Sequence, residues 1–204
     1  MIAIIDYGVG NIHSVISALD KLEIENVLTA DPEVIKNADG IILPGVGAFR
    51  DAIKSLEDTG LIPLIKKCVG EGKPLLGICL GMQLLYEKSF EDGEYTGLGL
   101  LKGEVKAFNP YISKDLKIPH MGWNKLEIKQ NSPIFKYLGE NEFVYYVHSY
   151  FACGNDEDVL ASSDYGIEVP GVVGNKNIMG MQFHPEKSSD TGLKLLKAFG
   201  EMIK

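Results

Sequence analysis

The chain has 204 residues, of which 45% are hydrophobic and 24% charged, as expected for one globular domain spanning residues 1–204. Its 20 basic and 28 acidic residues leave a formal net charge of −8, which gives no electrostatic support to nucleic-acid binding. The apolar runs are too short to cross a membrane, and the N-terminal MIAIIDYG lacks the features of a signal peptide. Three widely spaced cysteines without a CxxC pair favour a reducing cytoplasm, and we expect neither a metal nor a cofactor.

The first half of the chain alternates between apolar strand patterns and helical patterns. We predict strands at Ile2–Asp6, Asn26–Thr29, Gly40–Leu43 and Pro74–Ile78, and helices at Asn11–Leu22 and Leu61–Val69. Alternation of this kind is typical of an α/β fold with a parallel, doubly wound sheet.

The second half carries strand patterns joined by short turns rich in Gly, Asn and Asp. We predict strands at Gly99–Phe108, Trp123–Ile128, Phe143–Ala152, Val159–Ser162, Gly171–Val173 and Ile178–Phe183, and one closing helix at Thr191–Ile203. The expected architecture is therefore an open sheet with a parallel core and appended antiparallel strands.

A cysteine lies between two glycines at the join of a predicted strand and a helix. The stretch GICLG at residues 77–81 has the form of the G-x-S-x-G nucleophile elbow, with the sulfur of Cys79 in place of oxygen. Such a turn strains the backbone at the nucleophile, while the glycines relieve crowding. The start of a helix also favours a thiolate. A buried core cysteine between glycines fits the motif about equally well.

A histidine and a glutamate follow the last predicted strand. His184 precedes Pro185, which favours extended angles, and residues two apart in an extended chain project to the same face. His184 and Glu186 can therefore lie side by side, at the carboxyl end of a strand like Cys79. Taken alone, His184 fits a surface loop better than a catalytic site. Together with the elbow, it predicts a Cys–His–Glu site for nucleophilic catalysis.

Two further features point to the same edge of the sheet. The glycine-rich turn PGVG at residues 44–47 can direct backbone N–H groups at a reacting carbonyl, as can the N–H of Leu80, although a plain turn is an alternative. Gln83 lies one helical turn after Cys79, where its amide could bind a ligand or cap a buried carbonyl. Cys68 and Cys153 are expected to be unreactive, and His120 and His148 structural or interfacial.

Three motifs carry a resemblance to a known family. PGVG (44–47), GICLGMQ (77–83) and QFHPE (182–186) resemble those of the class I, or triad, glutamine amidotransferases, whose fold is flavodoxin-like. Further stretches are similar to the glutaminase subunits of imidazole glycerol phosphate synthase, namely IDYGVGNIHSV (5–15), PHMGWN (119–124), YYVHSY (145–150) and QFHPEKSS (182–189).

The resemblance implies a reaction and a partner. Cys79 would attack the side-chain amide of glutamine, His184 would protonate the departing ammonia, and Glu186 would orient His184. The ammonia would pass to a (β/α)8-barrel cyclase subunit, held as a heterodimer, which makes imidazole glycerol phosphate and AICAR in histidine biosynthesis. The implied positions are Gly45, Val46 and Leu80 for the oxyanion hole; Gly47, Gln83, Ser149 and Tyr150 for glutamine; and Asn11, Trp123, Tyr145 and Lys187 for the partner.

Two other functions compete with this one. A free-standing cysteine hydrolase of γ-glutamyl compounds could use the same site, and a non-catalytic binding module could hold a buried cysteine. The length of the chain favours the amidotransferase subunit, because the glutaminase fold leaves no room for an acceptor site. Trp123, the single tryptophan, could either fill the core or contact a partner.

Overall fold

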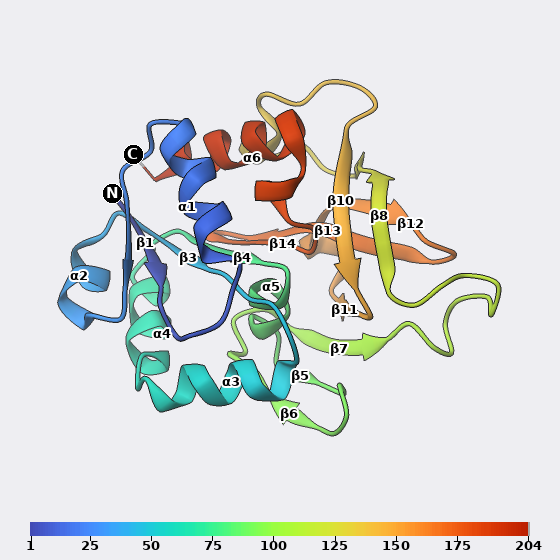
Figure 1. The fold of residues 1–204 in the computed structure, drawn as a ribbon, viewed down its shortest axis with the longest axis horizontal. Coiled ribbons are helices and arrows are strands. Elements are labelled where there is room, and N and C mark those ends of the chain that lie inside the picture. Colours follow the sequence, from blue (N-terminus) through green and yellow to red (C-terminus); the bar gives the residue numbers. More distant parts are fainter. Residues whose placement is uncertain (204) are drawn as a thin grey trace.

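An eight-stranded sheet forms the centre of the computed structural model, which describes residues 1–203 and leaves Lys204, the last residue of the predicted domain, outside (Figure 1). The strand order is β2-β1-β3-β4-β14-β13-β12-β9. The bounds are β1 Ile2–Ile5, β2 Asn26–Thr29, β3 Gly40–Leu43, β4 Leu75–Ile78, β9 Glu127–Ile128, β12 Val159–Asp164, β13 Glu168–Asn175 and β14 Ile178–Met181.

The sheet is parallel on one side and antiparallel on the other. Strands β2, β1, β3, β4 and β14 pair in parallel, whereas β13, β12 and β9 are added antiparallel to β14. The parallel part has the order 2-1-3-4-5, which is that of flavodoxin-like sheets. The predicted parallel core with appended antiparallel strands is therefore confirmed.

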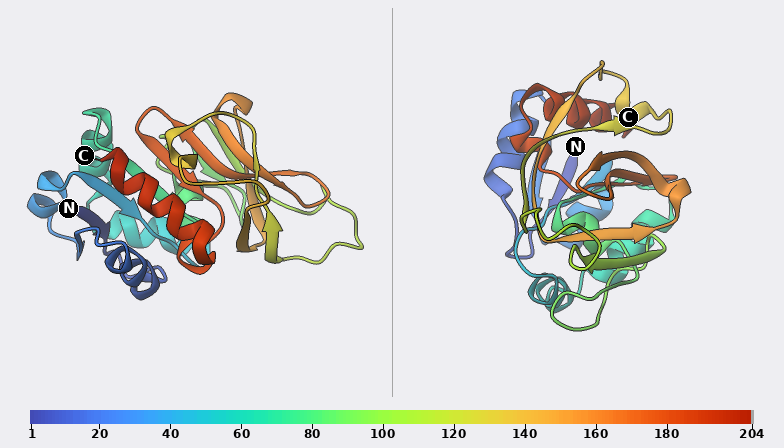
Figure 2. Two further views of the ribbon diagram at one scale, coloured as in Figure 1. Left: turned by 90° about the horizontal axis from the view of Figure 1, so that it is seen from above. Right: turned by 90° about the vertical axis from the view of Figure 1, so that its right-hand side faces the viewer.

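Helices cover both faces of the parallel part (Figures 1 and 2). One face carries α1 (Ile12–Lys21) and α6 (Ser189–Met202), and the other carries α2 (Pro32–Asn37), α3 (Phe49–Asp58) and α4 (Ile62–Gly70). Successive side chains of a strand point to opposite faces. In β1, therefore, Ile2 and Ile4 pack in the cluster that contains α1 and α6, while Ala3 and Ile5 pack in the other.

Two smaller sheets lie at the end of the molecule away from the termini (Figure 1). One pairs β8 (His120–Lys125) with β10 (Phe143–His148), and the other has the order β11-β7-β5-β6. The bounds in the second sheet are β5 Lys88–Ser89, β6 Tyr95–Thr96, β7 Gly103–Ala107 and β11 Tyr150–Gly154. The predicted strand Phe143–Ala152 is wrong as a single element, because the chain leaves one sheet for another at Ser149.

The remaining elements are short. They are α5 (Leu80–Leu84) and the 3-10 turns η1 (Pro133–Phe135), η2 (Asp156–Asp158) and η3 (Pro185–Lys187). The strand predicted from Gly99 begins only at Gly103, since the N–H groups of Leu98, Leu100 and Leu101 donate back to carbonyls at the end of α5. No helix within residues 1–203 combines the length and the apolar character needed to cross a membrane.

Candidate active site

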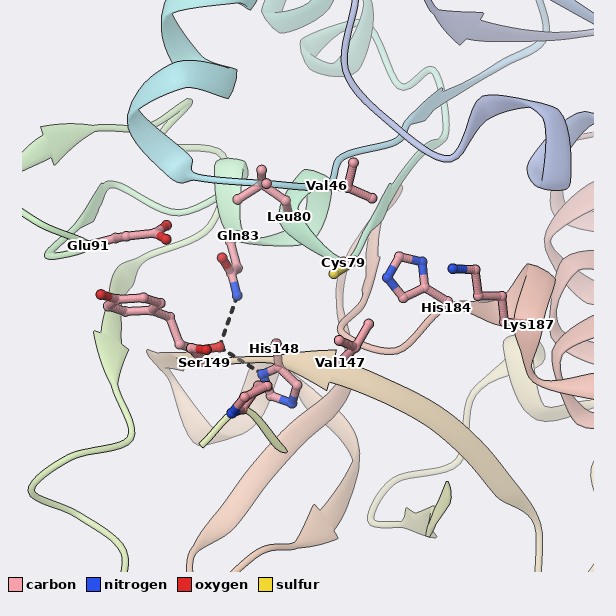
Figure 3. A pocket seen from close by; sticks show the side chains of 13 residues that line it. Val46, Cys79, Leu80, Gln83, Glu91, Val147, His148, Ser149, His184 and Lys187 are labelled. Carbon is pink, nitrogen blue, oxygen red and sulfur yellow. Dashed lines mark hydrogen bonds between the residues drawn. The ribbon is translucent and has the colours of Figure 1, made fainter. Parts of the chain in front are cut away.

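Three loops meet where neighbouring parallel strands end. β4 lies between β3 and β14, so the turn at 44–47, Cys79 and His184 follow adjacent strands. They surround a pocket of about 330 Å³ (Figure 3). The lining includes most of the predicted catalytic, oxyanion and substrate positions, namely Val46, Gly47, Cys79, Leu80, Gln83, Ser149, Tyr150 and His184. Gly45 and Glu186 are not among the lining residues.

The backbone at Cys79 has the strain of a nucleophile elbow. Its φ of 54° and ψ of −111° are unusual for a residue with a side chain. Its N–H donates to the carbonyl of Met181 in β14, at 2.7 Å. A Cβ atom added at Gly81 would lie 1.9 Å from the carbonyl oxygen of Leu43, and one at Gly77 would lie 2.7 Å from that of Gly81. The glycines on both sides of Cys79 are therefore needed for the close approach of strand and helix.

His184 and Glu186 form a buried pair. The Nδ1 atom of His184 lies 2.8 Å from Oε1 of Glu186, and their side chains are 3% and 1% exposed. His184 is extended, as predicted, but Glu186 lies in η3, so the contact is made across a 3-10 turn rather than along a strand. Asn11 donates through Nδ2 to the same Oε1 at 3.3 Å. Oε2 of Glu186 has no partner within residues 1–203.

The surroundings of His184 keep its imidazole protonated. Burial alone would lower the pKa of His184, but the neighbouring Cys79 and Glu186 outweigh it and raise the pKa to about 10. Figure 3 shows the imidazole beside the sulfur of Cys79. A protonated imidazole next to a thiol can serve as the general acid for a leaving amine.

The turn after β3 packs closely against the first turn of α5. A Cβ atom added at Gly45 would lie 2.6 Å from the nitrogen of Gly81 and 2.9 Å from Cβ of Leu80. Gly47 has a φ of 93°, which favours glycine. Val46, Gly47 and Leu80 line the pocket on the side of Cys79. Both segments therefore bring main-chain atoms to the pocket that Cys79 lines.

An amide network forms another wall of the pocket. Nε2 of Gln83 donates to the carbonyl of Tyr150 and to Oε1 of Gln182, each at 3.0 Å, and Nε2 of Gln182 lies 3.9 Å from Sγ of Cys79. Both amide hydrogens of Gln83 are thus engaged, which leaves its Oε1 to accept a hydrogen bond from a ligand. Ser149 and Tyr150 enter the pocket at the break between β10 and β11.

Glu91 is a pocket residue that the sequence analysis missed. Its Oε2 accepts a hydrogen bond from the N–H of Phe49, the first residue of α3, at 2.8 Å. Burial raises the pKa of the Glu91 carboxyl. Glu91 lies in the acidic stretch FEDGEY (90–95), where the sequence offers no pattern that singles out one carboxylate.

Two buried histidines support the wall at Tyr150. Nδ1 of His148 donates to the Tyr150 carbonyl at 2.7 Å, and Nε2 of His148 accepts from Nδ1 of His120 at 2.9 Å. Burial lowers the pKa of His148 to about 3 and that of His120 to about 4. This neutral pair supports the pocket wall, which is one of the two roles, structural or interfacial, expected for these histidines.

The four predicted partner positions divide into two groups. Trp123 is 55% exposed and meets Tyr145 edge to face on the paired strands β8 and β10, so it does not fill the core. Lys187 lines the pocket, and Asn11 contacts Glu186.

Cys68 is buried in the core, and burial raises the pKa of the Cys153 thiol.

Comparison with known proteins identifies close relatives. Residues 3–202 match the family model of glutamine amidotransferase class-I. The chain is 54% identical to imidazole glycerol phosphate synthase subunit HisH of Oceanobacillus iheyensis, covering 100% of both chains. It is 52% identical to the subunit of the same name from Caldanaerobacter subterraneus subsp. tengcongensis, covering 100% of this chain and 99% of the relative. The solved structure of PurLQS from Thermotoga maritima has the same fold, with a TM-score of 0.75 at 20% identity over 100% of this chain and 98% of that one.

Proposed function

The chain belongs to the class-I glutamine amidotransferase family, and we propose that it hydrolyses glutamine at Cys79 and supplies the ammonia to a cyclase subunit of imidazole glycerol phosphate synthase, in histidine biosynthesis. The observation that carries this proposal is the meeting of Cys79, His184 and the turn at 44–47 around one pocket. Relatives more than 50% identical over their whole length bear the name of that synthase subunit.

The geometry is suited to a thioester mechanism. With its proton held by His184, Sγ of Cys79 attacks the γ-carbonyl carbon of glutamine, and the oxygen takes up negative charge beside the N–H groups of Gly45, Val46 and Leu80. His184 donates its proton to the nitrogen, the C–N bond breaks, and ammonia leaves. Water then attacks the thioester while His184 takes its proton, the C–S bond breaks, and glutamate is released. The net reaction consumes glutamine and water and gives glutamate and ammonia.

The far wall of the pocket matches the backbone groups of an amino acid. The half-buried Glu91 carboxylate and Oε1 of Gln83 can accept hydrogen bonds from an α-ammonium group. The chain at Gly47, Ser149 and Tyr150 lines the same pocket and can hold the rest of glutamine. An acidic group opposite the nucleophile favours a zwitterionic substrate over a simple amide.

An apolar surface next to the pocket supports the docking of a partner. On one face of β8 and β10, Met121 pairs with Val147 and Trp123 pairs with Tyr145. We call these four residues the outer face. Met121 is 60% exposed, and Val147 also lines the pocket, so the outer face reaches the pocket. Exposed apolar residues gathered in this way are typical of interaction sites. We propose that a (β/α)8-barrel cyclase docks here.

A docked partner also explains how the product could be used. Ammonia released to water at neutral pH is mostly protonated and then cannot act as a nucleophile. An interface that covers the pocket would shelter ammonia on its way to the acceptor. A free-standing hydrolase of γ-glutamyl compounds would have no use for the outer face, and the names of the relatives do not favour it.

The proposal is tested by purifying the chain with and without the cyclase subunit of the same organism. Glutamine hydrolysis would be measured for the chain alone, for the complex, and for the complex with the nucleotide substrate of the cyclase. We expect slow hydrolysis by the chain alone and strong stimulation in the complex, with formation of imidazole glycerol phosphate from glutamine. Full-rate hydrolysis without any partner would instead support the free-standing hydrolase.

A further inference from the structure

A buried tyrosine hydroxyl holds the turn that follows β3. Tyr7 comes shortly after β1, which pairs in parallel with β3, so Tyr7 and Pro44 lie at the same edge of the sheet. The hydroxyl of Tyr7 donates a hydrogen bond to the carbonyl oxygen of Pro44 at 2.5 Å. Tyr7 is only 5% exposed and packs in the same apolar cluster as Leu80. The core thus fixes the ring, and the ring fixes the hydroxyl.

This hydrogen bond acts on the peptide that joins Pro44 to Gly45. In a planar trans peptide the carbonyl and the following N–H point in opposite directions. Holding the Pro44 carbonyl therefore also sets the direction of the Gly45 N–H. Pro44 is buried, so its carbonyl requires a partner, and Tyr7 provides one. Without the hydroxyl, the peptide would be free to rotate towards another donor.

The hydroxyl remains a donor while the active site is charged. Burial, and after it the electrostatic interaction with Cys79, raises the pKa of the Tyr7 hydroxyl well above its ordinary value. The other side of Pro44 is closed by the loop at Gly10, where an added Cβ atom would lie 3.1 Å from Cβ of Pro44. Pro44 is therefore confined between a fixed donor and a closely packed loop.

We propose that Tyr7 is a positioning residue for the glutaminase reaction, because its hold on the Pro44 carbonyl aims the backbone N–H groups of the turn at 44–47 towards the developing oxyanion. This inference rests on the proposed function, in which that turn contributes to the oxyanion hole. Tyr7 touches neither substrate nor reacting atoms in this role, and it acts only through the peptide.

The experiment compares two reactions of the same thiol in the complex with the cyclase subunit. Hydrolysis of glutamine passes through an oxyanion, whereas alkylation by iodoacetamide displaces iodide and forms none. In Tyr7→Phe we expect kcat for glutamine hydrolysis to fall about tenfold or more, with KM little changed, because removal of one oxyanion donor typically lowers kcat by about 10²–10³ and misalignment is a milder loss. The alkylation rate at Cys79, resolved by peptide mass, should change less than about twofold.

A third readout uses the aldehyde analogue of glutamine, glutamate γ-semialdehyde. Its carbonyl accepts Sγ of Cys79 to form a tetrahedral adduct, whose oxygen occupies the position of the oxyanion. Its affinity should fall in Tyr7→Phe by a factor similar to that in kcat/KM. Rates are normalised to the concentration of folded complex that elutes as a heterodimer in size-exclusion chromatography, so that a partly unfolded preparation does not imitate the effect.

Tyr137→Phe is the matched control. This substitution also removes a tyrosine hydroxyl that donates a hydrogen bond, in this case to Oε1 of Glu201 at 2.6 Å. Tyr137, however, does not line the pocket. Tyr137→Phe should leave all three readouts unchanged. Unchanged kcat in Tyr7→Phe would overturn the proposal, as would an equal loss of hydrolysis and alkylation, which would place the effect on the thiol or the fold. If iodoacetamide alkylates Cys79 in the wild-type complex but that complex does not hydrolyse glutamine, the proposed function itself is wrong.

Discussion

The main-chain carbonyl of Tyr145 accepts a hydrogen bond from the N–H of His184, with 3.1 Å between oxygen and nitrogen. The N–H of Tyr145 in turn donates to Oγ of Ser188 at 2.9 Å, and that hydroxyl donates to the carbonyl of His184 at 2.7 Å. Strand β10 and the loop that carries His184 are thus joined by a main-chain hydrogen bond and by the hydroxyl of Ser188. The Tyr145 side chain belongs to the outer face, so a partner bound there contacts the strand that holds His184.

The first prediction concerns the outer face. Because Trp123 is 55% exposed, Trp123→Ala should leave the circular dichroism spectrum and basal glutamine hydrolysis nearly unchanged. It should weaken binding of the cyclase subunit by about 2 kcal/mol, roughly 30-fold in Kd, and reduce stimulation of hydrolysis. Binding would be measured by calorimetry on the same preparation.

Ile128→Ala is the control for this prediction. Ile128 is also exposed, at 45%, but it lies on β9 at the edge of the large sheet and outside the outer face. It should bind the cyclase like the wild type. An unfolded Trp123→Ala protein would show that the tryptophan is needed for folding. If Trp123→Ala binds the cyclase subunit as tightly as the wild type does, the interface lies elsewhere.

The second prediction concerns the division of labour between His184 and Glu186. His184→Ala should lower kcat for glutamine hydrolysis by roughly 10²–10⁴-fold, because it removes the proton donor. Glu186→Gln should be milder, since Glu186 orients the imidazole and does not itself transfer a proton. The pH dependence of kcat/KM separates the two roles further. Glu186 helps to raise the pKa of His184 to about 10, so its removal should move the alkaline limit of activity to lower pH.

Profiles of kcat/KM from pH 6 to 10.5, recorded in the complex, would check this shift. A Glu186→Gln enzyme with a larger loss than His184→Ala would reverse the assignment of roles. An alkaline limit that stays in place would show that Glu186 does not act on the imidazole proton.

The third prediction concerns acid stability. The pKa values of His148 and His120 are lowered to about 3 and about 4, whereas an unfolded histidine titrates near 6.5. As the pH falls below about 6.5, the unfolded chain therefore binds protons that the folded chain does not. The free energy of unfolding should decrease from pH 6.5 to about 4 and be insensitive to these groups above pH 7.

Urea unfolding at pH 7.0, 6.0 and 5.0 would measure this slope. His148→Asn should be less stable at pH 7.0 but should show a shallower decrease on acidification, because one of the two buried imidazoles is gone. The exposed His13 provides the control, and His13→Gln should keep the wild-type slope. A slope that does not change in His148→Asn would contradict this origin of the acid sensitivity.

Much of the parallel core could be predicted because β1, β3 and β4 are continuous buried runs without polar side chains. β2 and β3 have the predicted bounds, and β1 and β4 differ by one residue. The helix α3 received no predicted bounds, although Phe49, Ala52, Ile53 and Leu56 repeat at helical spacing and are buried. The second half was harder, because a period of two continues through Ser149 and does not reveal a change of sheet.

The proposed catalytic residues lie in local sequence motifs, whereas the residues that support them do not. Cys79 and His184 carry their chemistry in the residue type, and short neighbouring patterns place them at strand ends. Tyr7, Glu91 and His120 act through contacts with residues far along the chain, at Pro44, Phe49 and His148. Their own neighbours in the sequence give no sign of these contacts, which arise only when the sheet assembles.

In the proposed mechanism, the γ-glutamyl group of glutamine is transferred to Sγ of Cys79. The most direct test is an acid quench of the complex during turnover, followed by peptide mass spectrometry. A thioester at Cys79 predicts one γ-glutamyl group on the peptide that contains Cys79, and Cys79→Ala should lose both this adduct and glutamine hydrolysis. Cys68→Ala and Cys153→Ala should retain both. A γ-glutamyl group on Cys153, or continued hydrolysis by Cys79→Ala, would exclude Cys79 as the nucleophile.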